Sequence, residues 1–162
     1  MTSGYEKMKE HGISLRAAAE CDMPDLLEWR NHPETRKSSF NTDSITPEAH
    51  EAWFKKKLVS AETVIYIAMS GSDKIGSARF EDTGEAIRTS VMLNPAFFGK
   101  RLGSKVIALA TKKYMAEKKP SKPLVAEIKT SNAASIRAFA KADFKESFVT
   151  LVHAGEEEKN DA

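Results

Sequence analysis

The turn between an apolar run and a helical pattern holds the residues whose types and spacing most directly suggest chemistry. In "VMLNPAFFGKRLGSKVIALA", Gly99 and Gly103 stand four positions apart, with Lys100, Arg101 and Lys105 around them. The first turn of a helix has unpaired backbone N–H groups and the positive end of the helix dipole, so it binds phosphate where glycine lets the backbone come close. A P-loop has four residues between its glycines and then Lys-Ser or Lys-Thr, which this stretch lacks. The pattern predicts a phosphate-binding turn of another kind, although glycines that only turn the chain would look the same.

The elements that would position this turn follow from hydrophobic periodicity and from turn residues. Strands are predicted at 13–18, 63–69, 74–81 and 86–93, and the short turns between the last three imply an antiparallel meander. Helices are predicted from the cap Asp22 to about Asn31, from the cap Thr46 to about Ser60, and from about Gly103 to Lys118. The polar stretch between the first two helices reads as a loop. A strand at 124–129, a helix at 132–142 and a last strand at 144–154 complete the order.

Length and composition indicate one globular domain. The 162 residues suit a single core, and 41% are hydrophobic and 30% charged, so we expect a domain over 1–154 and a disordered acidic tail over 155–162. The net charge is only +2 and there is no Lys/Arg run, so a nucleic-acid partner is not expected. No stretch is apolar enough for a membrane span or a signal core, which predicts a cytoplasmic protein. Cys21 is the only cysteine, so an internal disulfide framework is excluded and a zinc site is not expected. We expect it to act as a small apolar residue rather than as a nucleophile.

The element order and two motifs resemble the GNAT superfamily of acetyl-CoA-dependent N-acetyltransferases, over roughly Ile13 to Ala154. In that family, a Q/R-x-x-G-x-G/A turn and the strand before it hold the pyrophosphate and pantetheine of coenzyme A. The turn maps onto residues 98–103, with Phe98 at the polar position and Arg101 at the middle glycine. The segment "NAASIRAFAKADF" is similar to the family pattern N-x-x-[AS]-x-x-x-[YF]-x-K-x-x-F, although Asn132 could also be a plain helix cap.

The resemblance implies an α+β (α/β/α-like) GNAT fold, with a central mixed, mostly antiparallel sheet and helices on both faces. It implies acetyl-CoA as cosubstrate and no metal. The residues implied to bind the cofactor are Met92, Leu93, Phe98, Gly99, Lys100, Arg101, Leu102, Gly103, Ser104, Asn132, Ser135 and Phe139.

A narrower resemblance concerns the acceptor. The stretch "LLEWRNHPETRKSSFNTDSITPEAHEAWFKKKL" is similar to GNAT enzymes that acetylate amino sugars on nucleotides, such as the pseudaminic acid pathway acetyltransferase. It implies a small-molecule amine as partner and an acceptor side lined by Trp29, Arg30, Asn31, Arg36, Ser39, Phe40 and Arg79. Arginine suits a diphosphate and aromatic rings stack on a base or sugar, but Trp29, Trp53 and Phe54 could equally belong to the core. Whether the chain forms a homodimer stays open.

The reaction implied is attack of a neutral amine on the acetyl thioester. Glu127 is the candidate base, directly or through a water, and its alternative role is a surface or cross-strand ion pair. Glu81 and His50 are weaker candidates. Phe139 stands where many relatives have a tyrosine acid, so the thiolate would leave unaided. At pH 7, deprotonating a lysine amine costs roughly 4.6 kcal/mol and an amine of pKa near 8 only about 1.4, which favours an amino sugar or an α-amine.

Two alternatives stay open. One is a protein N-terminal acetyltransferase, because such GNAT members carry a related W-x-N opening. The other is a catalytically silent module that binds acyl-CoA, which the changes at Phe98, Arg101 and Phe139 would suit.

Overall fold

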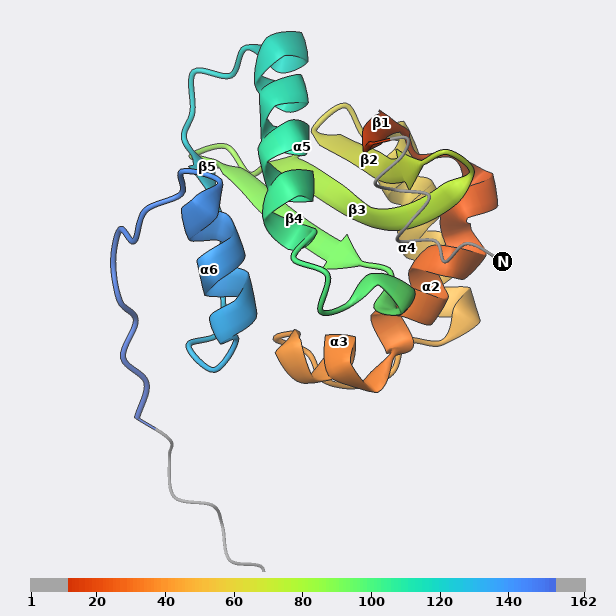
Figure 1. Cartoon of the computed structure of the whole chain (residues 1–162), viewed down its shortest axis with the longest axis horizontal. Coiled ribbons are helices and arrows are strands. Elements are labelled where there is room, and N and C mark those ends of the chain that lie inside the picture. The colour runs from red at the N-terminus through yellow and green to blue at the C-terminus, as the bar shows by residue number, and fades with distance from the viewer. Residues whose placement is uncertain (1–11, 154–162) are drawn as a thin grey trace, which may run out of the picture.

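A five-stranded sheet forms the centre of the molecule, in the order β1-β2-β3-β4-β5 (Figure 1). The computed structural model describes residues 12–153 of the chain. Neighbouring strands are antiparallel except β4 and β5, which are parallel. The strands are β1 (Ser14–Ala17), β2 (Thr63–Ser70), β3 (Asp73–Asp82), β4 (Ile87–Leu93) and β5 (Leu124–Val125). The expected fold class, a mostly antiparallel mixed sheet with helices, is confirmed.

Helices cover both faces of this sheet, because successive strand residues point to opposite sides. Helix α5 (Gly103–Lys118) crosses one face, where Phe80 and Tyr114 stack with ring centroids 4.4 Å apart (Figure 1). Helices α2 (Met23–Asn31) and α4 (Pro47–Val59) cover the other face, where Trp29 and Phe54 join the β2 isoleucines in the core. Close packing on both faces holds the sheet rigid behind its β4–β5 edge.

Local capping explains where the helices on the second face begin. Thr46 Oγ1 accepts a hydrogen bond from the Ala49 N–H at 3.2 Å, and Pro47 occupies the first position of α4. A 3-10 helix (Glu20–Asp22) leads into α2. The stretch after α2 was predicted as a loop, and that prediction is wrong in part, since α3 spans Pro33–Ser38. His32 Nδ1 caps it by accepting from the Glu34 N–H at 3.2 Å, a cap that a search for Ser, Thr, Asp or Asn overlooks.

The C-terminal part departs from the sequence prediction. Helix α6 (Ala133–Lys141) forms as expected, but β5 has only two residues instead of the six predicted, and residues 144–153 form no strand. A strand requires a partner that supplies backbone hydrogen bonds, and hydrophobic patterning in the sequence does not reveal whether one is present. Residue 154 and the predicted acidic tail lie outside the described residues.

None of the helices within residues 12–153 is long and apolar enough to cross a membrane.

Candidate active site

The site begins where β4 and β5 separate. The two strands pair only at Ile87 with Leu124 and at Arg88 with Val125. Beyond Arg88, the outer edge of β4 runs through Met92 and Leu93 without a strand partner in the described part of the chain. The unpaired backbone N–H and C=O groups of this edge can hydrogen-bond an extended ligand with amide groups of its own.

The glycine-rich turn follows this open edge and leads into α5. Leu102 is the N-cap of the helix and gives no side-chain cap, so the N–H groups of Gly103, Ser104 and Lys105 have no capping side chain. Leu102 itself is buried in the core and fixes the helix start. Gly99 has a φ of 73°, in the left-handed region that suits glycine. The turn therefore presents backbone donors and the positive end of a helix dipole next to β4.

Arg101 occupies the position where the family motif has its middle glycine. Its φ is 56°, so the arginine adopts the left-handed backbone that a glycine would adopt without strain. The turn keeps a glycine-like course and adds a cation to it. The replacement therefore leaves the backbone path through the turn intact.

Helix α6 closes the other side of the turn. Gly103 faces α6, and a Cβ added at this glycine would lie 3.4 Å from the Cβ of Ala138, in ordinary van der Waals contact. Asn132 is the N-cap of α6, its Oδ1 accepting from the Ser135 N–H at 3.1 Å. Phe139 is buried and packs edge-on against Phe144, with ring centroids 5.1 Å apart. Asn132 thus has the structural role that the sequence left open, and Phe139 brings no proton donor to the site.

Side chains of α2 and α3 hydrogen-bond the backbone of the loop that follows α3, residues 39–45. Asn31 makes two hydrogen bonds of 2.8 Å with the backbone of Ile45, donating from Nδ2 and accepting at Oδ1. Arg30 donates to the Asn41 carbonyl at 2.6 Å, and Arg36 Nε donates to the Thr42 carbonyl at 2.9 Å. The three side chains predicted to line the acceptor side therefore shape the loop over 41–45.

This loop presents Phe40 to solvent, while Trp29 points the other way. Phe40 is 68% exposed, beside Ser39, whose hydroxyl donates to the Thr35 carbonyl at 2.7 Å. Trp29 is only 4% exposed and packs in the α2/α4 core, which corrects its expected place on the acceptor surface. Its position on the buried stripe of α2, with Leu26, accounts for this burial.

Two contacts join α3 to its surroundings, one at the glycine-rich turn and one at the segment after β5. The His32 ring meets Phe98 edge-on with centroids 5.6 Å apart, and Lys129 Nζ donates to the Lys37 carbonyl at 3.3 Å. The first contact joins the start of α3 to the glycine-rich turn, and the second joins its end to the segment after β5. Helix α3 consequently lies across the mouth of the β4–β5 opening (Figure 1).

A charged cluster covers the α2/α4 face of the sheet beside this opening. Arg79 lies with its guanidinium carbon 5.0 Å from the centre of the Trp53 ring, and its Nε is 3.4 Å from Glu81. Lys57 Nζ pairs with Glu81 at 2.5 Å. Arg88 stands directly opposite Glu81 in the β3–β4 register, and it lies 3.7 Å from Glu127. We call these six residues the charged cluster: Trp53, Lys57, Arg79, Glu81, Arg88 and Glu127.

Burial and neighbouring charges set the ionisation of this cluster. Burial lowers the pKa of Arg79 from its usual value, partly offset by Glu81, and the buried Nε has no hydrogen-bond partner among residues 12–153. Burial alone would raise the pKa of Glu81, but the hydrogen bond from Lys57 and the charges of Arg79 and Arg88 outweigh it and lower the pKa. Glu81 is therefore a carboxylate held by cations, whereas Glu127 is more exposed and has a looser partner.

Sequence reasoning missed three members of the cluster as site residues, namely Trp53, Lys57 and Arg88. Trp53 is 36% exposed and meets Arg79, although helical periodicity gave it the same core role as Phe54. Lys57 lies one turn after Trp53 on α4. Their i,i+4 spacing in the sequence already predicted that the two side chains share a face of the helix. Finding Arg88 required the register between β3 and β4.

The other weaker base candidate, His50, lies apart from the opening. It is buried on α4 and its ring stacks on Phe54 with centroids 5.9 Å apart. Burial lowers the pKa of His50, with a partly opposing hydrogen bond to the Met23 backbone. Its packing between α4 and α2 suits a structural role.

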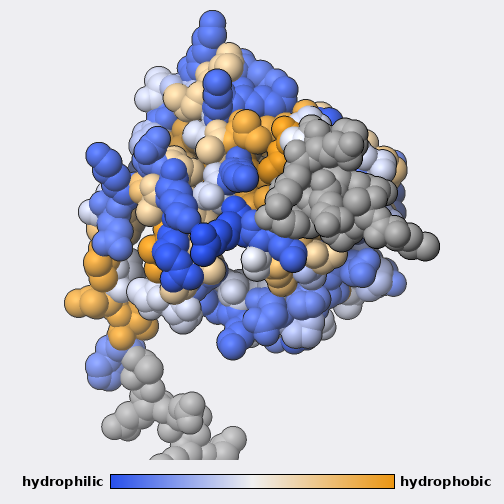
Figure 2. All heavy atoms as spheres, viewed as in Figure 1, coloured by the Kyte–Doolittle hydropathy of each residue, from blue (hydrophilic) through white to orange (hydrophobic). Residues whose placement is uncertain are grey.

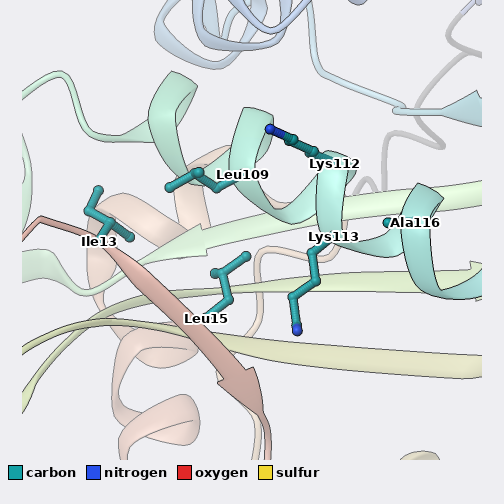
Figure 3. A pocket seen from close by; sticks show the side chains of 6 residues that line it. All are labelled: Ile13, Leu15, Leu109, Lys112, Lys113 and Ala116. Carbon is teal, nitrogen blue, oxygen red and sulfur yellow. The ribbon is translucent and has the colours of Figure 1, made fainter.

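A separate apolar hollow of about 370 Å³ lies between β1 and α5 (Figure 3). Its lining residues are Ile13, Leu15, Leu109, Lys112, Lys113 and Ala116. None of them belongs to the glycine-rich turn or to the charged cluster. No group of three or more His, Cys, Asp or Glu side chains within residues 12–153 could hold a metal ion.

Solved structures with a similar fold share little sequence with this chain. Aminoglycoside acetyltransferase AAC(6')-Ib in complex with coenzyme A has a TM-score of 0.71 at 21% identity, covering 84% of this chain and 86% of that one. Spermidine N-acetyltransferase from Vibrio cholerae, with CoA and spermine, has a TM-score of 0.75 at 14% identity, covering 84% and 82%. An N-acetyltransferase from Staphylococcus aureus Mu50 has a TM-score of 0.70 at 22% identity, covering 85% and 86%.

The sequence comparisons differ in outcome. No curated protein matches the chain. The model of the acetyltransferase (GNAT) domain family matches residues 13–145, which is most of the chain. This match confirms the expected enzyme class, an acetyl-CoA-dependent N-acetyltransferase, and the chain belongs to the GNAT acetyltransferase family.

Proposed function

We propose that this enzyme transfers acetyl from acetyl-CoA to the primary amine of an amino sugar carried on a nucleotide. Acetyl-CoA supplies the acetyl group as a thioester. The open edge of β4 at Met92 and Leu93 would hold its pantetheine, and the N–H groups of Gly103 and Ser104 would hold its pyrophosphate. The uncapped start of α5, with Lys100 and Arg101 beside it, supports this placement.

The net positive charge of the charged cluster is the main support for an anionic acceptor. Three cations, Lys57, Arg79 and Arg88, stand against two carboxylates, Glu81 and Glu127. The Arg79 guanidinium is already positioned on Trp53, and a planar guanidinium suits a phosphate oxygen. A net positive surface attracts an anionic acceptor and disfavours a polyamine. Phe40, exposed on its anchored loop, is suited to stack on a base or sugar.

Glu127 is proposed as the base that takes the proton from the acceptor amine. It lies on the segment where β5 leaves β4, and one of its carboxylate oxygens is 3.7 Å from the Arg88 guanidinium. Its carboxylate would accept the proton directly or through a water, and the neutral amine would then attack the thioester carbonyl. The C–S bond of the adduct would then break. Phe139 has no proton to give, so the sulfur would leave as a thiolate, and the proton that the nitrogen loses as the amide forms would reach it through solvent.

A panel of amines tests the acceptor. Release of the coenzyme A thiol is measured with a nucleotide-linked amino sugar, the same free amino sugar, spermidine, kanamycin and peptides with free N-termini. We expect kcat/KM for the nucleotide-linked sugar to exceed the others by about tenfold or more. Higher activity with spermidine or kanamycin would overturn the anionic acceptor, and activity with peptides alone would favour the protein N-terminal acetyltransferase. Binding of acetyl-CoA without release for any amine would favour the silent module.

A pair of variants assigns the effect to Arg79. Arg79→Met should lower kcat/KM for the nucleotide-linked sugar by roughly tenfold while changing that for the free sugar little. Lys55→Met is the control, because Lys55 is an exposed cation on the same helix as Trp53 and pairs with Glu51 outside the cluster. An equal loss in the two variants would contradict a role for Arg79 in recognition.

A further inference from the structure

The glycine-rich turn is anchored at both ends and exposed in its middle. Phe97 and Leu102 are 7% and 0% exposed and belong to the same core cluster, so the core holds the turn on either side. Asn94 caps the short 3-10 helix before the turn, and its Nδ2 donates to the Lys74 carbonyl of β3 at 2.8 Å. Phe98 is 37% exposed. Its ring therefore projects from a rigid base.

Helix α3 has little packing of its own. None of its six residues, Pro33–Ser38, is buried. Figure 2 shows mainly hydrophilic atoms where α3 lies in Figure 1, at the bottom of the view. A helix of this length is not stable by itself in water, so its place across the β4–β5 opening depends on contacts with the rest of the molecule. The contact at its start therefore helps to determine where α3 lies.

His32 connects Phe98 to the start of α3. Its ring meets the Phe98 ring edge-on, with centroids 5.6 Å apart and an interplanar angle of 87°. The same ring caps the helix, since Nδ1 accepts from the Glu34 N–H at 3.2 Å. On the backbone, the His32 N–H donates to the Trp29 carbonyl at 3.3 Å, and the His32 carbonyl accepts from the Arg36 N–H at 3.0 Å. A movement of Phe98 would therefore act on the residue that begins α3.

We propose that Phe98 is a positioning residue, which couples acetyl-CoA bound at the glycine-rich turn to the placement of α3 through the ring of His32. The inference rests on the proposed cofactor site and not on the identity of the acceptor. Phosphate held by the N–H groups of the turn restricts the motion of the turn, so Phe98 presents a steadier surface to His32. An edge-on aromatic pair is worth about a two- to tenfold change in an equilibrium constant, which bounds the coupling.

The placement of α3 matters because of the loop that follows it. This loop, residues 39–45, presents Phe40 to the proposed acceptor, and Phe40 is 68% exposed. Placing α3 also places the start of this loop. Bound acetyl-CoA would therefore raise the affinity for the acceptor, and by linkage the acceptor would raise the affinity for acetyl-CoA by the same factor.

Hydrogen exchange from milliseconds to seconds tests the coupling in the full-length protein, with acetyl-CoA as the probe. In the wild type, saturating acetyl-CoA should slow exchange over residues 34–39 about two- to tenfold, and should also slow it over 99–105. Phe98→Ala should lose the effect over 34–39 and keep that over 99–105. His32→Asn should do the same, because asparagine retains an oxygen that can cap α3 while the ring is removed. Phe98→Tyr retains the ring and should behave as the wild type.

Leu109→Ala is the matched control. Leu109 is 39% exposed, close to the value for Phe98, and it lines the separate hollow between β1 and α5. This variant should keep both effects of acetyl-CoA. An undiminished effect over 34–39 in Phe98→Ala, or no effect there in a wild type whose turn is protected, overturns the coupling alone. Acetyl-CoA that binds without protecting 99–105 contradicts the proposed cofactor site and, with it, this inference.

Steady-state kinetics separate positioning from a general loss of stability. With the best amine of the panel, Phe98→Ala should raise KM for the amine about two- to tenfold and change kcat less, and Phe98→Tyr should restore KM. Phe98→Ala combined with His32→Asn should raise KM no further than the larger single effect, because both substitutions remove the same contact. Additive effects of the two substitutions, or a fall in kcat at unchanged KM, would overturn the proposal.

Discussion

Arg101 combines two properties in one residue, a strained backbone and a cation beside the proposed phosphate site. A non-glycine residue at φ 56° destabilises the folded state by roughly 1–2 kcal/mol. Glycine avoids this strain, but its more flexible unfolded chain costs about 0.5–1 kcal/mol of stability. Arg101→Gly should therefore raise the free energy of unfolding by roughly 0.5–1 kcal/mol. It should also weaken acetyl-CoA several-fold at low salt and less at high salt, because exposed charges are screened. Urea unfolding and calorimetry measure the two effects.

Lys119→Gly separates strain from binding. Lys119 has a φ of 46° at the C-terminal end of α5, far along the helix from the glycine-rich turn. The variant should gain similar stability and leave the affinity for acetyl-CoA unchanged. An unchanged affinity in Arg101→Gly at low salt would contradict a phosphate contact by Arg101.

Glu127 differs from the other carboxylates near the site in being exposed and loosely paired. If it accepts the amine proton, Glu127→Gln should keep acetyl-CoA affinity and lower kcat by about a hundredfold or more. With an amine of pKa near 8, the residual rate should rise with pH as the free amine fraction grows. Glu51→Gln, which removes a surface ion pair with Lys55, should leave kcat unchanged. Wild-type turnover of Glu127→Gln from pH 6 to 9 would remove Glu127 from the mechanism.

At the scale of elements, α4 carries a pH-dependent contribution to stability through His50. The buried Nε2 has no hydrogen-bond partner among the described residues, and burial lowers the pKa of His50. The unfolded chain, with a histidine pKa near 6.5, binds a proton before the folded chain does, so stability falls as pH drops below about 6.5. The limiting slope is about 1.4 kcal/mol per pH unit.

His50→Gln should flatten this slope. The free energy of unfolding is measured by urea denaturation from pH 8 to 5 in both proteins. The variant is expected to be less stable at pH 8, because a well-packed ring is lost, yet to lose less stability on acidification. The same slope in both proteins would show that other groups cause the pH dependence.

Elements with local signals could be predicted from the sequence, and those that depend on distant partners could not. Thr46-Pro47 marks the start of α4, and Gly103 to Lys118 is the extent of α5 in both prediction and structure. The short β5 and the missing strand after α6 depend on whether a neighbour supplies hydrogen bonds, which the pattern of apolar residues does not encode.

The same division applies to the site as part of the whole molecule. The glycine-rich turn is a contiguous motif, so its place at the end of β4 could be predicted. The charged cluster joins α4, β3, β4 and the segment after β5, and its members meet only through the strand register that sets Glu81 opposite Arg88. The assignment of Trp53 to the core also depended on distant structure. Helical spacing places Trp53 on the apolar face of α4, but it does not show whether the sheet extends far enough to cover the ring, which instead meets Arg79.

Asp22 connects distant parts of the molecule, and its pKa predicts how the whole fold responds to acid. It is fully buried, accepts hydrogen bonds of 2.7 and 2.8 Å from Arg16 of β1, and lies 2.8 Å from Lys74 of β3. The hydrogen bond from Arg16, with further contributions from Lys74 and the Ala19 backbone, outweighs burial and holds the pKa of Asp22 far below its usual value. The stabilisation is therefore fully present above the unfolded pKa of about 3.9 and is lost as pH falls below it.

Asp22→Asn should lower the free energy of unfolding at pH 7 by roughly 3 kcal/mol, the low end for breaking a buried pair, because Arg16 and Lys74 remain partly solvated. The difference between the two proteins should shrink as pH falls from about 4 towards 2, because the carboxyl group then takes up a proton in the unfolded wild type while it stays ionised in the folded one. Asp82→Asn is the matched control. Asp82 pairs with Lys122 at the surface, where solvent screens the pair, so this variant should lose clearly less stability than Asp22→Asn. A difference between wild type and Asp22→Asn that stays constant down to pH 2 would mean that packing of the side chain, and not its charge, joins β1, β3 and α2.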